Sequence, residues 1–146
     1  MTSRYFHVSE FDCHDGVPYP EAWTGDRLAA LMSQLDIIRA EWGGPIRIVS
    51  GYRTASWNGK VAGASGSQHV EGRAADIAPM VKGTVLHAAT ADLHGRIMRL
   101  LGQQQLPLIG GVGNYPGKWV HVDVRAKPGG HLAQWQGTGV GSEPIG

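Results

Sequence analysis

The clearest pattern in the chain is a run of apolar residues spaced three or four positions apart, as on one face of an α-helix. These residues are Leu28, Leu31, Leu35, Ile38 and Trp42. Thr24 or Asp26 is suited to cap the start of this helix, and Gly43-Gly44-Pro45 ends it. The spacing therefore predicts an amphipathic helix whose apolar face packs against a core.

The same spacing predicts a second helix, and short β-branched runs predict strands. The second helix is marked by Leu86, Ala89, Leu93, Ile97 and Leu100. Strands are expected at Ile46–Ser50 and at residues 74–78, the latter ended by Pro79. Residues 108–112 and 118–124, joined by a turn at 114–117, are expected to form a hairpin.

The segments between these elements are rich in small and turn-forming residues. Residues 1–19 are interpreted as an extended arm that leads into turns, and the Gly- and Pro-rich tail from residue 126 offers Trp135 as an anchor. Residues 52–72 form a long loop rich in Gly, Ser and Ala, of a length that is usually functional or disordered. Helices and short strands without a βαβ rhythm predict an α+β fold, a small antiparallel sheet with flanking helices in one domain over residues 1–146.

Composition limits the classes of function. The chain has 146 residues, of which 42% are hydrophobic and 17% charged, as in globular domains. A net charge of +1 gives no strong attraction to nucleic acid or an anionic membrane, so neither is expected as a partner. The chain is expected to be a monomer. Cys13 is the one cysteine, so an internal disulfide is excluded. No signal peptide or apolar membrane segment is visible, which predicts a protein made in the cytoplasm that another factor must release.

Most of the seven histidines are poor candidates for a shared metal site. His87 and His94 are separated by about 10 Å along the predicted second helix, so they cannot bind one ion and are interpreted as ordinary helix residues. His7 lies in the arm, as does the cluster Asp12-Cys13-His14-Asp15, whose adjacent side chains rarely converge on one ion. His131 lies in a glycine-rich loop, and its role stays open.

His69, Asp76 and His121 form a better candidate set. A loop carries His69 into the predicted strand, where Ala75 and Ile77 would face the core and Asp76 the other side. Residues 119–124 alternate strictly, so three valines share one face and Trp119, His121 and Asp123 share the other. Two imidazoles and a carboxylate match a catalytic zinc site with one open position. On spacing alone, the alternative to a metal site is that these three residues lie apart and each makes its own hydrogen bonds.

At these residues the chain resembles the M15 family of zinc peptidases, which includes D-alanyl-D-alanine carboxypeptidases and phage L-alanyl-D-glutamate endopeptidases. The resemblance covers about residues 5–136. It rests on Ser50-Gly51-Tyr52-Arg53, Ser67-Gln68-His69, Gly72, Ala74-Ala75-Asp76-Ile77 and Trp119-Val120-His121-Val122-Asp123, together with the opening Phe6-His7-Val8-Ser9-Glu10-Phe11. It implies the fold shared by D-Ala-D-Ala peptidases and hedgehog proteins.

The resemblance also implies roles for individual residues. His69, Asp76 and His121 take the zinc-ligand positions. Arg53 takes the position of an arginine that steadies charge on the attacked carbonyl, with a surface salt bridge as the alternative. Ser67 takes a substrate-contacting position, with a turn-forming role as the alternative. Further candidate substrate-binding residues are Gln68, Tyr115 and Trp119.

The chain departs from the family pattern at the general base. Many members carry Glu or Asp three residues before the last histidine ligand, where this chain has Lys118. Asp123 is the nearest carboxylate on the ligand face, and it is expected either to act as the base or to orient a ligand. Glu71 is a weaker candidate, because no pattern fixes its position in the loop.

Three hypotheses follow. The first is a zinc-dependent endo- or carboxypeptidase that binds and cuts the stem peptide of bacterial peptidoglycan, associated with a phage or prophage and acting in the periplasm or wall, or carried on a virion. The second, motivated by Lys118, is a wall-binding or virion module that kept Zn²⁺ and lost hydrolysis. The third is a domain without metal.

Overall fold

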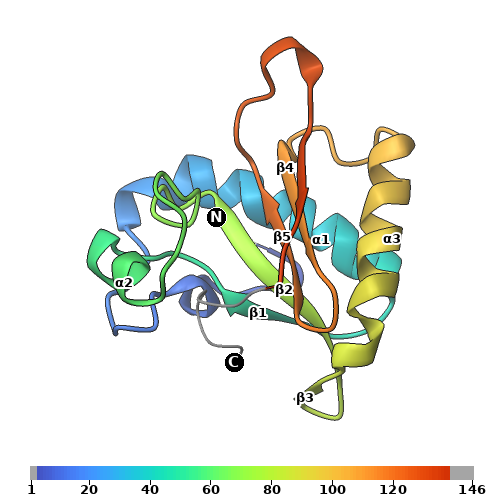
Figure 1. Ribbon diagram of the computed structural model, residues 1–146, viewed down its shortest axis with the longest axis horizontal. Helices are drawn as coiled ribbons and strands as arrows, with labels where there is room; N and C mark the ends of the chain where they lie inside the picture. The colour runs from blue at the N-terminus through green and yellow to red at the C-terminus, as the bar shows by residue number, and fades with distance from the viewer. Residues whose placement is uncertain (1–2, 139–146) are drawn as a thin grey trace.

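The computed structural model describes residues 3–138 and is built around one sheet (Figure 1). Its strands are β1 (Ile46–Ser50), β2 (Ala74–Val81), β3 (Thr84–Val85), β4 (Gly111–Tyr115), β5 (Trp119–Asp123) and β6 (Ala133–Gln136). The order across the sheet is β1-β2-β5-β4-β6, and β3 pairs with the far end of β2. All neighbours are antiparallel except β4 and β6, which run parallel. The predicted α+β fold is confirmed, with one parallel pair added at the edge.

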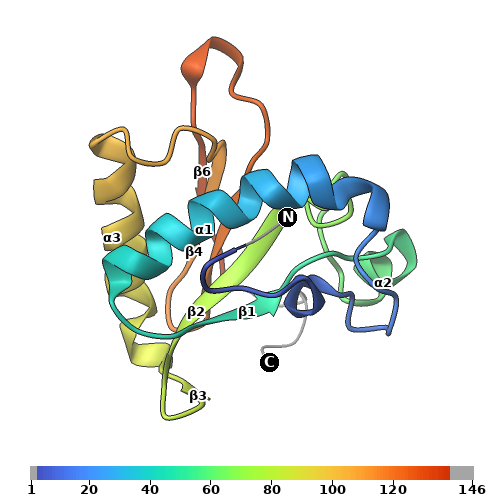
Figure 2. The ribbon, with the colours of Figure 1, turned by 180° about the vertical axis from the view of Figure 1, so that it is seen from behind.

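Two helices cover one face of this sheet. They are α1 (Ala29–Trp42) and α3 (Thr90–Gly102), and Figure 2 shows α1 crossing the sheet from behind. The predicted apolar face of α1 is buried: Leu28, Leu31, Leu35 and Ile38 are at most 1% exposed. None of the helices in residues 3–138 is long and apolar enough to cross a membrane.

The predicted C-terminal end of α1 is confirmed, but the predicted N-terminal cap is not. Gly43 ends the helix with a left-handed φ of 80°, as predicted. At the start, a π-helical turn (Thr24–Leu28) runs directly into α1, so the first N–H groups of α1 need no side-chain cap. Thr24 and Asp26 therefore do not cap α1, and that expectation was wrong. Short 3-10 turns also occur at Val8–Phe11, Glu21–Trp23, His87–Ala89 and Pro128–Gly130.

The structure corrects three further boundaries. The long loop contains a short helix, α2 (Ala55–Lys60), capped by the Thr54 side chain. The first hairpin strand is Gly111–Tyr115, so it begins and ends three residues later than expected, and the turn after it lies at residues 116–118. Strand β2 runs through Pro79, because the N–H of Met80 donates to the carbonyl of Pro45, the residue before β1, and the proline nitrogen faces the other side. On that side β5 pairing ends at Ile77 and Val120, so no hydrogen bond is lost.

The two faces of the sheet carry different chemistry, as the alternation predicted. Ala75, Ile77, Val120 and Val122 are fully buried in the main core beneath α1 and α3. The alternate residues of β2 and β5 lie on the opposite face, where the loop between α2 and β2 and the side chain of Trp135 from the edge strand β6 cover them. Polar residues there are sheltered by the chain itself, so this face is a partly enclosed site.

We expect Leu35→Ala to lower the free energy of unfolding by about 2–5 kcal/mol, because it empties a fully buried position of α1. Ile37→Ala is the matched control, since Ile37 lies on the same helix and is 36% exposed. Its effect should stay below about 1 kcal/mol. Urea denaturation followed by circular dichroism measures both, and equal losses would contradict the burial of the predicted helix face.

Candidate metal centre

The site lies along one row of residues that crosses the sheet. Asp76 on β2 is paired with His121 on β5, His121 with Gly113 on β4, and Gly113 with Trp135 on β6. Residues directly opposite each other in neighbouring strands project from the same face. The register therefore brings a carboxylate, an imidazole and an indole together, and His69 joins them from the loop before β2.

His69, Asp76 and His121 converge around a single point. Nε2 of His69 lies 3.3 Å from Oδ2 of Asp76, and Nδ1 of His121 lies 3.2 Å from Oδ1 of the same carboxylate. One ligand atom from each residue lies within 4.8 Å of the other two, and the two rings are edge to face with centroids 5.1 Å apart. Within residues 3–138 this is the one cluster of His, Cys, Asp or Glu with such spacing.

The partners of each imidazole assign its tautomer. Nδ1 of His69 lies 2.7 Å from the carbonyl oxygen of Gly51, which only accepts, so this nitrogen carries the hydrogen and Nε2 keeps its lone pair. Nε2 of His121 lies 2.7 Å from Oδ2 of Asp123, so His121 donates from Nε2 and keeps its lone pair on Nδ1. Both lone pairs are directed at Asp76.

The lone pairs of His69 and His121 and the carboxylate of Asp76 face one another, and a cation between them would satisfy all three groups. Burial raises the pKa of Asp76, but without a metal, protons on the facing nitrogens of His69 and His121 would outweigh this effect and hold that pKa well below its ordinary value. Burial lowers the pKa of His69. It acts in the same direction on His121, whose pKa is nevertheless raised by the two carboxylates beside it, those of Asp123 and Asp76. The carboxylate therefore stays ionised and attracts positive charge.

The spacing fits a metal ion. At bond lengths of about 2.0–2.2 Å, two ligand atoms of a tetrahedral site lie about 3.3–3.6 Å apart. Nδ1 of His121 and Nε2 of His69 lie 3.2 and 3.3 Å from the two different oxygens of Asp76, close to that value, and one ligand atom of each residue lies within 4.8 Å of the others. Imidazole nitrogen and carboxylate oxygen suit zinc and its neighbours in the transition series. The three residues can hold such an ion while leaving a position for a further ligand.

Asp123 lies directly behind His121. It is fully buried, and its two oxygens accept hydrogen bonds from Nε and Nη2 of Arg125 at 2.8 and 2.6 Å, in addition to the bond from His121. Burial raises the pKa of Asp123, but the hydrogen bonds from His121 and Arg125 lower it below the ordinary range. Asp123 does not line the pocket. This geometry favours the ligand-orienting role over the general-base role.

Arg53 approaches the centre from the other side. Its guanidinium is 4% exposed, and Nη2 lies 3.4 Å from Oδ2 of Asp76. Nε donates to Ser50 at 3.3 Å and Nη1 to Asn58 at 3.2 Å. The backbone N–H of Arg53 also donates to the carbonyl of His69. Arg53 is therefore a buried, fixed cation beside the proposed metal ligands, and the surface salt bridge considered from the sequence is wrong.

A pocket of about 330 Å³ opens over the three ligands. One side is the small-residue loop that carries Ser67 and Gln68, and another holds the aromatic rings of Tyr115, Trp119 and Trp135. The complete lining is Arg53, Gly63, Ala64, Ser65, Gly66, Ser67, Gln68, His69, Asp76, Tyr115, Trp119, His121, Arg125 and Trp135. All four residues proposed to bind substrate lie in this lining. The hydroxyl of Ser67 also accepts from the N–H of His69, so the turn-forming role is present as well.

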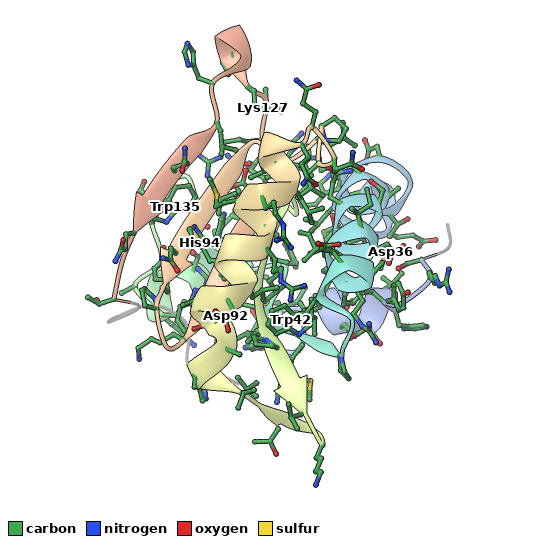
Figure 3. The ribbon with its side chains drawn as sticks, turned by 90° about the vertical axis from the view of Figure 1, so that its right-hand side faces the viewer. Asp36, Trp42, Asp92, His94, Lys127 and Trp135 are labelled. Carbon is green, nitrogen blue, oxygen red and sulfur yellow. The ribbon has the colours of Figure 1, made fainter. Side chains whose placement is uncertain are left out.

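Glycine residues on β4 give the aromatic wall its position. A Cβ at Gly113 would lie 2.4 Å from Nε1 of Trp135, so only glycine leaves room for the indole over the sheet. The ring of Trp135 lies 4.9 Å from that of His121, and its N–H donates to the hydroxyl of Tyr115 at 2.8 Å. Figure 3 shows Trp135 on the side of the sheet away from α1.

The other candidates from the sequence lie outside the pocket. Lys118 is in the turn between β4 and β5. Glu71 is half exposed and pairs with Arg27 and Arg73 at the surface. Asp12 and Asp15 accept backbone N–H groups within the arm, as turn residues do. Among residues 3–138, Asp76 is the one carboxylate in the pocket lining.

The sequence patterns did not predict that Arg125, Asn58 and Trp135 belong to the site. Arg125 follows the alternating strand by two positions, so its place on the ligand face was available from that alternation. Asn58 lies in the helix that the glycine-rich loop concealed. Trp135 was expected as an anchor only, because the parallel pairing of β6 with β4 left no local signal.

Comparison with protein-family models gives a match over residues 4–123 to the family described as Peptidase M15. The match contains all three ligand residues, and it ends before Arg125 and Trp135. No curated protein matches the chain.

We expect His69→Ala and His121→Ala to weaken metal binding more than a hundredfold, because loss of even an outer partner of a ligand costs about 10- to 100-fold. His131→Ala is the control, since His131 is exposed and lies outside the pocket lining. Elemental analysis of the purified, folded proteins should find one metal per chain in the wild type and the control. Full retention by either ligand variant would contradict the assignment.

We expect Gly113→Ala to destabilise the protein by about 1–3 kcal/mol, because the new methyl group overlaps the indole of Trp135. Gly95→Ala on α3 is the matched control, since a Cβ there meets nothing within 4 Å. It should be neutral or stabilise the helix by about 0.5–1 kcal/mol. Thermal denaturation gives the stabilities, and tryptophan fluorescence reports movement of the ring. An unchanged Gly113→Ala protein would show that Trp135 does not lie over β4.

Proposed function

Because the chain belongs to the M15 family of peptidases, we propose that it is a zinc-dependent enzyme that hydrolyses a peptide bond in the stem peptide of bacterial peptidoglycan. One observation carries the proposal: the lone pairs of His69 and His121 and the carboxylate of Asp76 meet at the base of an open pocket. Such a three-ligand centre has room for the group that reacts.

Zinc fits the donor set best, since two imidazoles, one carboxylate and an open position form a catalytic zinc arrangement. When bound there, zinc supplies a Lewis acid that polarises a peptide carbonyl and lowers the pKa of water. The three side chains are almost completely buried, so their charges act with little screening by solvent.

Arg53 is proposed to stabilise the charge that develops on the attacked carbonyl oxygen. Its guanidinium is held on three sides, by Ser50, Asn58 and Asp76, and it reaches the pocket wall. A donor that is already fixed needs no reorganisation as charge appears, which is the condition for strong electrostatic stabilisation. Lysine at this position could not reproduce these directed hydrogen bonds.

Asp123 and Arg125 are proposed to hold His121. The carboxylate fixes the hydrogen on Nε2 of His121, and Arg125 holds that carboxylate with two hydrogen bonds. The guanidinium of Arg125 also lies 5.1 Å from the centre of the Trp135 ring. The second ligand is therefore oriented by a chain of contacts that ends at the aromatic wall.

The pocket suits a peptide with small side chains and carboxylate groups. The wall formed by residues 63–66 consists of Gly, Ala and Ser, which allows close approach of an extended chain. Arg53 and Arg125 add positive charge. Tyr115 accepts the indole N–H of Trp135, so its own hydroxyl hydrogen is available to a substrate acceptor. Alanine and free carboxylates are features of the wall stem peptide, and this match supports the substrate.

Whether the bond is internal or terminal follows from the products, and both activities belong to the proposal. A role in wall lysis for a phage or prophage, with the chain acting in the periplasm or wall after release or on a virion, is the proposed context.

A second candidate function has one observation in its favour. Asp76 is the one carboxylate that the described part of the chain gives to the lining, and Lys118 stands where relatives place an acidic base. A protein with the zinc site and no effective base would bind the wall peptide without cutting it.

We expect the zinc-loaded wild type to cleave purified stem peptides, with products identified by mass spectrometry. His69→Ala should abolish cleavage, and Arg53→Lys should lower kcat by about 100-fold while zinc is retained. His131→Ala serves as the control with full activity. Stoichiometric zinc and peptide binding without any product would establish the binding module and contradict the enzyme.

A further inference from the structure

Asn58 on α2 contacts two parts of the pocket at once. The residue is 8% exposed. Its Oδ1 accepts from Nη1 of Arg53 at 3.2 Å, and its Nδ2 donates to the carbonyl of Ala64 at 3.1 Å. Since the guanidinium only donates and the carbonyl only accepts, the orientation of the amide is unambiguous. Both partners line the pocket, one as a cation and the other as a wall.

The backbone around Asn58 strengthens this link. Its carbonyl accepts the N–H of Gly63 at 2.8 Å, so the loop is tied to Asn58 through main chain and side chain. A Cβ at Gly63 would lie 2.0 Å from Oδ1 of Asn58 and 2.8 Å from Nη1 of Arg53. The loop therefore passes so close to the Asn58–Arg53 pair that only glycine fits there.

The helix that carries Asn58 is itself anchored. Thr54 caps α2 by accepting the N–H of Trp57 at 3.1 Å, and its hydroxyl donates to Asp15 at 2.8 Å. The N–H of Asn58 donates to the carbonyl of Thr54. Asn58 is thus a fixed point between the arm and the pocket.

We infer that Asn58 is a positioning residue that couples Arg53 to the peptide-binding loop at residues 63–68. Its two hydrogen bonds fix the direction of the Arg53 guanidinium and the position of the loop at Ala64 relative to it. Neither a carboxylate nor an apolar side chain can replace it, because the site requires one acceptor and one donor on the same short side chain. This role rests on the proposed peptidase function, and it concerns substrate binding and the reacting carbonyl, not the metal.

Two substitutions separate the two hydrogen bonds. Asn58→Asp keeps an acceptor for Arg53 and loses the donor to Ala64. It should raise KM about tenfold, the effect of one lost hydrogen bond of typical strength, with kcat little changed. Asn58→Ala loses both contacts and should also lower kcat by about 10- to 100-fold, because Arg53 is no longer held in place. Both variants should keep one zinc per chain.

Asn114→Ala is the matched control. Asn114 is on β4 but alternates with Gly113 and Tyr115, so it lies on the opposite face from His121. The same substitution there should leave KM and kcat unchanged. If Asn58 served folding alone, its variants would melt earlier, yet their folded, zinc-loaded fractions would keep wild-type KM and kcat, and that result would overturn the inference.

A second readout separates failure of this inference from failure of the proposed function. Amide hydrogen exchange of residues 63–68, followed by mass spectrometry, should accelerate in Asn58→Asp and Asn58→Ala and stay at the wild-type rate in Asn114→Ala. Should the wild type cleave nothing, the Kd of a stem peptide for the zinc-loaded protein takes the place of KM. Unchanged exchange and unchanged Kd in both Asn58 variants would contradict the coupling, whatever the catalytic activity.

Discussion

The site depends on the fixed tautomers of two buried histidines. The carbonyl of Gly51 holds the hydrogen of His69 on Nδ1, and the carboxylate of Asp123 holds that of His121 on Nε2. Each ring then presents its remaining lone pair to the same carboxylate, that of Asp76. Burial makes an uncompensated arrangement of this kind costly. A metal ion satisfies all three groups, so the hydrogen bonds behind the ligands determine what the pocket in front of them can bind.

The sheet allows this arrangement because glycines on β4 stand next to large side chains on the neighbouring strands. The row that joins Asp76, His121, Gly113 and Trp135 has an open position at the glycine, and the indole occupies that space. In the neighbouring row, a Cβ at Gly111 would lie 2.4 Å from Oδ2 of Asp123, so this glycine leaves room for the carboxylate behind the ligand. Strand β4 contributes Tyr115 to the pocket, and its glycines leave the space in which side chains of β5 and β6 come into contact.

Much of the fold and the ligand set could be predicted from the sequence, because those features have local periodic signals. The apolar spacing from Leu28 to Ile38 gave α1, and the alternation around His121 gave both faces of β5. The predicted start of α1 was wrong, because the preceding turn is also helical and no local sequence signal indicates this. The passage of β2 through Pro79 depends on where the partner strand β5 ends, which a single segment does not encode.

The ligand residues were identified by their family-like motifs, whereas the groups that support them required the tertiary structure. The resemblance assigned a role to Arg53, but its burial became visible only in its contacts with Ser50, Asn58 and Asp76. Trp135 reaches His121 only because β6 pairs in parallel with β4. Asp123 had two possible roles from its position on the strand, and the bonds from Arg125 favour that of orienting His121.

The most direct test of the metal centre is an anomalous difference map from crystals of the wild-type protein grown with zinc. The geometry predicts one peak about 2.0–2.2 Å from Nε2 of His69, Nδ1 of His121 and the carboxylate of Asp76. A peak bonded to the opposite nitrogen of either ring, or zinc bound only elsewhere on the protein, would contradict the assignment of these three residues as the centre of the site.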